Sequence, residues 1–172
     1  MLQAAIFVIF PFCMAFAAVS DMLSMTIANR VSAFLILSFA ILAPLTGMEW
    51  AQYGMHFATF AALLATTFAL FALGGMGGGD AKLIAATGLW FGFSPALAEY
   101  LIYSSLAGGA LTMAILVFRK SGISVIAGNN LFLRHFADSS VGVPYGIALG
   151  LGGLMAFSGS PLVAWALASL TH

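Results

Sequence analysis

The chain has 172 residues, of which five are Lys or Arg and five are Asp or Glu, so its formal net charge is zero. Charged residues make up 6% of the sequence and hydrophobic residues 63%, and the mean hydropathy is +1.12. About a quarter of the residues of a soluble domain are charged, so this composition predicts a membrane protein. It excludes a nucleic-acid-binding protein, which needs a basic surface, a disordered chain, and a disulfide scaffold, because Cys13 is the only cysteine.

Apolar stretches recur along the chain between charged residues and clusters of Gly, Pro or Asn. A spanning helix needs about 20 mostly apolar residues, so the sequence predicts an all-α bundle of about six transmembrane helices. Their expected ranges are 2–20, 31–48, 55–76, 81–95, 97–118 and 145–170. The fourth is short, which favours a tilted, partial or deeply buried helix. The connections are too short for a soluble domain, so we expect residues 1–172 to form a single integral-membrane domain.

The charges predict the orientation of this bundle. With six spans, every basic residue lies in the connections on one side, and the opposite connections carry Glu49 and no Lys or Arg. Because Lys and Arg favour cytoplasmic loops, we expect both termini to be external. The basic residues are Arg30, Lys82, Arg119, Lys120 and Arg134. Aromatic residues near the outer ends of the spans resemble an interfacial belt: Trp50, Tyr53, Trp90, Tyr100 and Trp165.

The first apolar stretch has a second interpretation. Ala15-Phe16-Ala17 follows an apolar run and resembles a signal-peptide cleavage site. A secretory signal normally opens with a basic segment, and residues 1–20 contain no Lys or Arg. A retained first span is therefore the favoured interpretation, with a cleaved signal as the minor alternative.

The long connection over 119–144 and the last span have patterns of their own. Polar residues such as Asn130 and Asp138 alternate with apolar ones at near-helical spacing, which predicts a short amphipathic helix on the cytoplasmic surface. Gly142, Gly146 and Gly150 recur every four residues, which predicts a small-residue face for close helix packing.

Two carboxylates are predicted to lie at one membrane depth. Asp21 ends the first span, and Asp80 begins the fourth after Gly74-Gly75-Met76-Gly77-Gly78-Gly79. Ionisable groups at membrane depth are costly and usually serve a function. Two close aspartates do not both ionise easily, so the pair can hold one proton near neutrality. The ionised member then takes a proton from water while the protonated member polarises a carbonyl, which is the requirement for metal-free peptide hydrolysis. The glycines would let a substrate backbone approach.

Other interpretations of these residues stay open. Asp80 can cap the fourth helix, and Asp21 can pair with Arg30 or Lys82 at the interface. A P-loop is excluded because Asp80 follows the last glycine. The three histidines are scattered and expected at the interfaces, which argues against zinc hydrolysis, and a Ser–His site has little support. These histidines are His56, His135 and His172.

The motifs around the two aspartates resemble those of type IV prepilin peptidases, the aspartic membrane proteases of bacterial pilus assembly. The run from Gly77 to Leu83 matches the GxGD-x-K-L pattern of that family. Asp21 with Ile27-Ala28-Asn29 resembles the family's first catalytic aspartate and its I-P-N, with Ala in place of Pro. The run from Val143 to Ala148 resembles a third stretch, P-Y-G-x-A.

The resemblance implies that Asp21 and Asp80 are the catalytic pair and that the chain removes leaders from prepilin or pseudopilin substrates at the cytoplasmic face of the bacterial inner membrane. It implies no metal or other cofactor. Bifunctional members carry a methyltransferase domain with paired CxxC motifs, and the single cysteine indicates the short, peptidase-only form associated with Flp-type tight-adherence pili. The supporting positions implied are Asn29, Gly77, Gly78, Gly79, Lys82, Pro144, Tyr145 and Gly146.

Two other functional classes remain as alternatives. A small proton- or cation-coupled transporter would also place aspartates within the membrane. A structural subunit of a secretion complex would tolerate replacement of both Asp21 and Asp80. The lipid bilayer is a partner in every case, and the sequence leaves the oligomeric state open.

Overall fold

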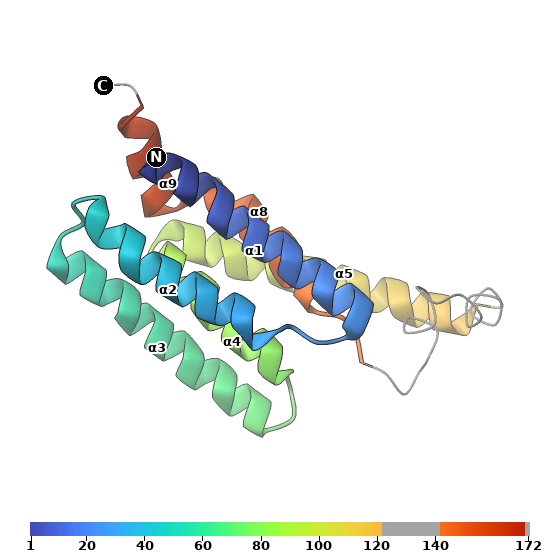
Figure 1. Ribbon diagram of the computed structural model, residues 1–172. Helices are drawn as coiled ribbons and strands as arrows, with labels where there is room; N and C mark the ends of the chain where they lie inside the picture. Colours follow the sequence, from blue (N-terminus) through green and yellow to red (C-terminus); the bar gives the residue numbers. More distant parts are fainter. Residues whose placement is uncertain (122–141, 171–172) are drawn as a thin grey trace.

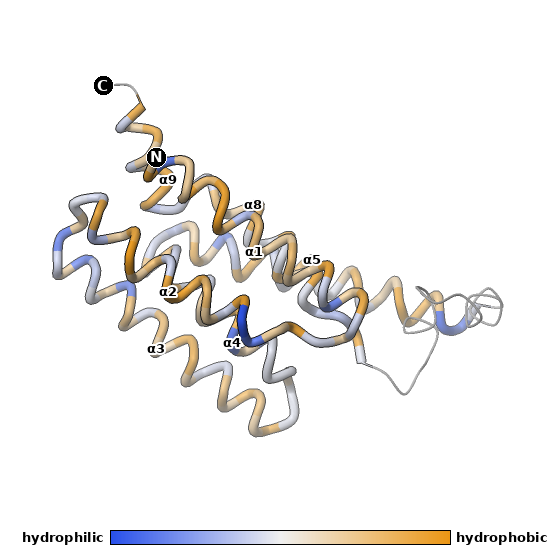
Figure 2. Tube along the Cα trace, viewed as in Figure 1, coloured by the Kyte–Doolittle hydropathy of each residue, from blue (hydrophilic) through white to orange (hydrophobic). Residues whose placement is uncertain are grey.

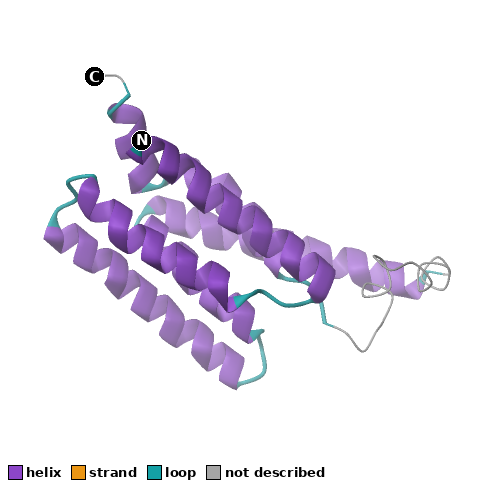
Figure 3. Ribbon diagram, in the orientation of Figure 1, coloured by secondary structure: helices purple, strands orange, loops and turns teal. Residues whose placement is uncertain are grey.

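The computed structural model describes residues 1–121 and 142–170 (Figure 1). In these residues every regular element is a helix and no strand occurs (Figure 3). The elements are α1 (Leu2–Ser24), α2 (Asn29–Leu45), α3 (Trp50–Ala72), α4 (Gly78–Phe91), α5 (Pro95–Lys120), α8 (Gly146–Ala156), η1 (Phe157–Gly159) and α9 (Pro161–Ala168). The all-α prediction is confirmed for this part of the chain. The predicted amphipathic helix, including Asn130 and Asp138, lies outside the described residues.

Within residues 1–121 and 142–170, three helices are long and apolar enough to cross a membrane: α1, α3 and α5. The segment Gly146–Gly159 and α9 together make a fourth span if this pair, bent by 43°, is counted as one, and α2 is a shorter apolar helix. Figure 2 shows hydrophobic residues along the helices and the most hydrophilic ones near their ends. Large apolar side chains such as Phe12 and Leu106 are more than half exposed on the outside of the bundle. Such a surface is stable in lipid and not in water, so the chain is a membrane protein.

The last predicted span, 145–170, is wrong as a single continuous helix. It is broken between α8 and α9, where Pro161 stands at the first position of α9. Proline has no backbone N–H and cannot continue a helix, but it suits a helix's first turn. The Ser160 side chain caps α9 by accepting a hydrogen bond from the Val163 N–H at 3.3 Å. The C-terminal stretch therefore changes direction within the apolar region.

The short fourth helix is enclosed by the others. α4 packs along α3 and also contacts α2, α5, α8 and α9. Ala81 and every residue from Leu83 to Phe91 are buried. Gly88 permits close packing, since a Cβ atom there would overlap the Leu63 side chain. The sequence left a tilted, a partial or a deeply buried helix open for this segment, and the structure has the deeply buried helix.

Two of the aromatic residues predicted to form an interfacial belt, Trp90 and Tyr100, are not at the interface. Trp90 is fully buried, and its Nε1–H donates to the Leu35 carbonyl at 3.0 Å. Tyr100 is also fully buried, with its ring 5.5 Å from that of Phe91. Trp50, by contrast, is 77% exposed, as a belt residue would be. Trp90 and Tyr100 are therefore core residues, because the helix end that carries Trp90 is surrounded by other helices.

The helix ends gather at two opposite ends of the bundle (Figure 1). At one end, α1 begins beside α9, and the Gln3 amide donates to the Ser169 hydroxyl at 3.1 Å. At the other end, α1 ends at Met25 in the left-handed conformation, with φ 53°. α3 ends before Gly74, whose φ of +76° suits glycine. The connections that follow these two ends bring the starts of α2 and α4 to that same end.

Candidate active site

Asp21 lies in the last turn of α1 on the face that points into the bundle. The buried residues of this helix recur every three or four positions: Ile6, Phe10, Cys13, Met14, Ala17 and Asp21. The Asp21 side chain is 5% exposed, and its Oδ2 accepts a hydrogen bond from the Gly146 backbone N–H at 2.7 Å. Gly146 is the first residue of α8, where free N–H groups attract negative charge. Asp21 is therefore held by the start of a helix distant in sequence.

Asp80 is presented by the first turn of α4, whose N-cap is Gly77. Burial raises the pKa of the Asp80 carboxyl to about 6, and the negative charge of Asp21 adds to this effect. A hydrogen bond from the Gly77 backbone acts in the opposite direction. The capping role considered for Asp80 is thus compatible with its place in the site, because the carboxylate is near both the helix N-terminus and Asp21.

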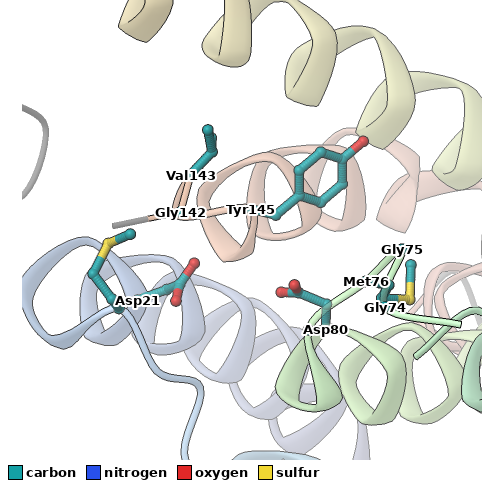
Figure 4. A pocket seen from close by; sticks show the side chains of 10 residues that line it. Asp21, Gly74, Gly75, Met76, Asp80, Gly142, Val143 and Tyr145 are labelled. Atoms are coloured by element: carbon teal, nitrogen blue, oxygen red, sulfur yellow. The ribbon is translucent and has the colours of Figure 1, made fainter. Parts of the chain in front are cut away.

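The two aspartates line one pocket with a volume of about 690 Å³. Asp21 enters it from α1 and Asp80 from α4, and Figure 4 shows both carboxylates directed into the same space. The structure therefore places Asp21 and Asp80 together at one end of the bundle, as the sequence predicts. In this pocket one carboxylate can accept a proton while the other donates one.

Sequence reasoning missed most of the other residues that line this pocket. Among the expected supporting residues, only Gly77 and Tyr145 line it. The remaining lining residues come from the connections between helices: Met25, Gly74, Gly75, Met76, Gly142 and Val143. Their positions depend on loop conformations that hydrophobic periodicity does not encode. The available signal was their place within or next to the three motifs in the sequence.

The glycines before Asp80 differ in what they contact. A Cβ atom on Gly77 would lie 2.7 Å from Oδ2 of Asp80. On Gly78 it would lie 3.2 Å from the Phe71 ring, and on Gly79 it would lie 3.2 Å from Cβ of Ile27. Gly77 therefore leaves room for the carboxylate itself, whereas Gly78 and Gly79 let α4 pack closely against its neighbours.

The glycines of the last motif show the same pattern. A Cβ atom on Gly146 would lie 2.7 Å from Cβ of Asp21, and one on Gly150 would lie 2.8 Å from Cβ of Ala18. The predicted small-residue face is confirmed at these two positions, where α8 packs on α1. It is wrong at Gly142, which is exposed and has nothing within 4 Å of an added Cβ.

Asn29 and Lys82 contact each other rather than the pocket. The Lys82 Nζ donates to Oδ1 of Asn29 at 2.9 Å in an exposed position, which ties the start of α2 to the start of α4. The hydrogen bond of Asp21 goes to Gly146, so the structure does not adopt an interfacial pairing of Asp21 with Lys82. Pro144 is buried next to Tyr145 and does not line the pocket.

Tyr145 forms one wall of the pocket. Its ring packs on Gly108 of α5, where an added Cβ would overlap the ring. Figure 4 shows the hydroxyl directed away from the two carboxylates. Burial raises the pKa of the Tyr145 phenol, and the charge of Asp80 adds to this. Of the two roles considered for Tyr145, the structure favours the wall of the site.

Within the described residues, no group of three or more His, Cys, Asp or Glu side chains is close enough to hold a metal ion. His56, expected at an interface, is instead 3% exposed. Its Nδ1 lies 2.7 Å from the Leu89 carbonyl oxygen, and its ring stacks on Phe39. This histidine supports the end of α4 that is opposite to Asp80.

The sequence pattern of the type IV leader peptidase family matches residues 8–118, which is more than half of the chain. The matched region contains both Asp21 and Asp80. The chain therefore belongs to the type IV leader peptidase family and is a membrane protease, and the family implies prepilin-type substrates in general. No curated protein and no solved structure matches the chain.

The raised pKa of Asp80 predicts a pH-dependent gain in stability for Asp80→Asn. The folded state binds a proton on Asp80 up to a pH of about 6, whereas the unfolded chain releases this proton near the ordinary aspartate pKa of 3.8. Ionised Asp80 therefore destabilises the fold, on the order of 2 kcal/mol after solvent screening, and this cost is fully present above pH 6. We expect the variant to melt about 5 °C higher at pH 7.5.

The difference in melting temperature should shrink as the pH falls from 6 towards 4, because the folded state then holds the proton on Asp80 and avoids the buried charge. Thermal unfolding in detergent across this range measures it. Glu99→Gln is the control, because it removes one exposed carboxylate of α5 that does not line the pocket. A gain for Asp80→Asn that is equal at pH 4 and pH 7.5 would contradict the assignment.

Two adjacent glycines on α5 test the Tyr145 wall. In Gly108→Ala the new methyl overlaps the Tyr145 ring, whereas Gly109 has nothing within 4 Å of an added Cβ. Both variants gain about 1 kcal/mol of helix propensity, so they differ mainly in their effect on the tyrosine. We expect Gly108→Ala to lower leader cleavage about tenfold and Gly109→Ala to leave it unchanged. Equal cleavage by the two folded variants would show that the ring position is unimportant.

Proposed function

We propose that the chain is an aspartic endopeptidase that removes the leader peptide from prepilin- or pseudopilin-like substrates at the cytoplasmic face of the bacterial inner membrane. The observation that carries the proposal is that Asp21 and Asp80 line the same pocket and direct their carboxylates into it. Two carboxylates from separate helices of an apolar bundle are costly to maintain without a use. Family membership supplies the class of reaction, and the carboxylate pair supplies a mechanism for it.

The surroundings of the two carboxylates support different roles for them. The Gly146 N–H stabilises negative charge on Asp21, so Asp21 is the general base that takes a proton from the attacking water. Asp80, whose carboxyl the negative charge of Asp21 helps to keep protonated, is the general acid that protonates the carbonyl oxygen as water adds to the carbonyl carbon. When the C–N bond breaks, Asp21 returns its proton to the leaving amine and Asp80 recovers one from the diol. Atoms and protons then balance over one hydrolysis.

The distribution of charge supports the proposed orientation. The pocket lies at the end where α1 ends and α4 and α8 begin, and the described basic residues belong to the same end. Arg30 is in the first turn of α2, Lys82 in the first turns of α4, and Arg119 donates to the Gly142 carbonyl at 3.2 Å. Glu49 precedes α3 at the opposite end. By the positive-inside rule the pocket faces the cytoplasm and both termini are external.

In this arrangement all six apolar segments belong to one membrane-embedded peptidase domain, with α4 enclosed by the others. The proposed chemistry needs water and two carboxylates and no cofactor, and the single Cys13 supports the short form of the family associated with Flp-type pili. Met25, Met76 and Val143 bring apolar side chains to the pocket, which suits an apolar stretch of substrate beside the cleaved bond.

Replacement of each aspartate tests this function directly. Asp21→Asn and Asp80→Asn keep the size and acceptor oxygen of the side chain but remove the proton exchange. We expect each to lower the cleavage rate of a prepilin-type substrate by at least a thousandfold, because acid–base groups contribute about 10²–10⁴ each and act together. Glu99→Gln is the matched control, since it removes an exposed carboxylate far from the pocket, and it should cleave normally.

Cleavage is measured with purified protein in detergent, after thermal unfolding has shown that each variant is folded. If folded Asp80→Asn kept more than a tenth of the wild-type rate, the aspartic mechanism would be abandoned. Proton or cation flux in vesicles that depends on both aspartates, without any cleavage, would instead favour the transporter alternative.

A further inference from the structure

A second pocket, of about 320 Å³, lies between α1 and α2, which run side by side (Figure 1). Its lining residues come equally from the two helices: Phe12, Cys13 and Phe16 from α1, and Arg30, Val31 and Phe34 from α2. Cys13 and Val31 are almost fully buried and form the floor, whereas Phe16 and Phe34 are each 49% exposed and form the sides. We call this surface the α1–α2 groove.

The α1–α2 groove is separate from the candidate active site. None of its lining residues lines the pocket of Asp21 and Asp80. Phe12 and Phe16 are one helical turn apart and are stacked with ring centroids 6.2 Å apart on the outer surface of α1. The groove therefore opens towards the lipid surrounding the bundle.

Arg30 gives this apolar groove a charged end. It lies in the first turn of α2, one helical turn from Phe34, and its side chain is exposed. Within the described residues it forms no hydrogen bond or ion pair. The nearby Lys82 adds a second positive charge at the start of α2 through its bond to Asn29. The described acids do not neutralise this charge, because Asp21 and Asp80 face the other pocket. Glu49 and Glu99 are at the opposite end of the bundle, before α3 and near the start of α5.

We propose that the α1–α2 groove binds one anionic glycerophospholipid. The Arg30 guanidinium pairs with the headgroup phosphate, and one acyl chain lies between Phe16 and Phe34 over the floor of Cys13 and Val31. Arg recognises phosphate through paired N–H donors, and basic pockets between membrane helices select anionic headgroups. In lipid the acyl chain gains little from burial alone, so the charge of Arg30 sets the preference.

The bound lipid would brace α2 against α1, the helix that carries Asp21. α1 carries Asp21 five residues after Phe16, and Met25, in its left-handed conformation, turns the chain towards α2. A lipid in contact with both helices would oppose their separation at this end. This inference needs membrane insertion but not the aspartic mechanism, so its test does not rely on cleavage.

Lipid retention tests the proposal. Delipidated wild-type protein in a mild detergent is mixed with phosphatidylglycerol or with phosphatidylcholine of the same acyl chains, and bound lipids are counted by native mass spectrometry. We expect one phosphatidylglycerol to be held at least fivefold more tightly than phosphatidylcholine and to raise the melting temperature saturably. Arg30→Gln should remove the headgroup preference. Phe34→Ala, at a half-exposed position, should weaken both lipids.

Lys120→Gln is the matched control, because it removes one exposed positive charge from the same end of the bundle. If it reduces phosphatidylglycerol binding as much as Arg30→Gln does, the preference comes from general surface charge and the site is overturned. Equal binding of the two lipids by wild type would also overturn it. A wild-type dimer that Phe34→Ala dissociates would also overturn the lipid site, because a second copy of the chain would then occupy the groove.

Discussion

The hydrogen bond from the Gly146 backbone to Oδ2 of Asp21 joins parts of the chain that are far apart in sequence. It fixes the start of α8 against the last turn of α1 at 2.7 Å and leaves the other carboxylate oxygen for the pocket. A buried carboxylate without a donor is strongly unfavourable in an apolar bundle. The packing of α8 on α1 and the pocket beside them both depend on this contact.

Small residues make that contact and the meeting of the aspartates possible. An added methyl on Gly146 would strike Asp21, and one on Gly77 would strike Asp80. α4 enters the middle of the bundle because Gly79 and Gly88 permit close packing against Ile27 and Leu63. The glycines therefore act mainly by admitting the protein's own side chains, rather than by clearing a path for substrate alone. Substitution at these positions changes the positions of the carboxylates themselves.

Sequence reasoning predicted the helical class and the meeting of Asp21 with Asp80, because both follow from the membrane: spans have a fixed length, and alternate connections return to the same side. It did not predict that Trp90 lies in the core, because a single sequence does not reveal which helix the others surround. The break before Pro161 was visible as a proline signal within an apolar stretch. The pocket residues Met25 and Val143 lie on connections, whose conformations depend on contacts made only in the folded chain.

The proposed mechanism requires Asp21 and Asp80 to act as one catalytic unit. The most direct test is the affinity of a peptide transition-state mimic, carrying a hydroxyl at the position of the attacked carbonyl, for the wild type, each Asp→Asn variant and the double variant. If one proton is held between the two carboxylates, either replacement removes the recognition of that hydroxyl. We predict that the double variant binds no more weakly than the weaker single variant. Losses in binding free energy that add in the double variant would show that the two aspartates act independently and would contradict the account.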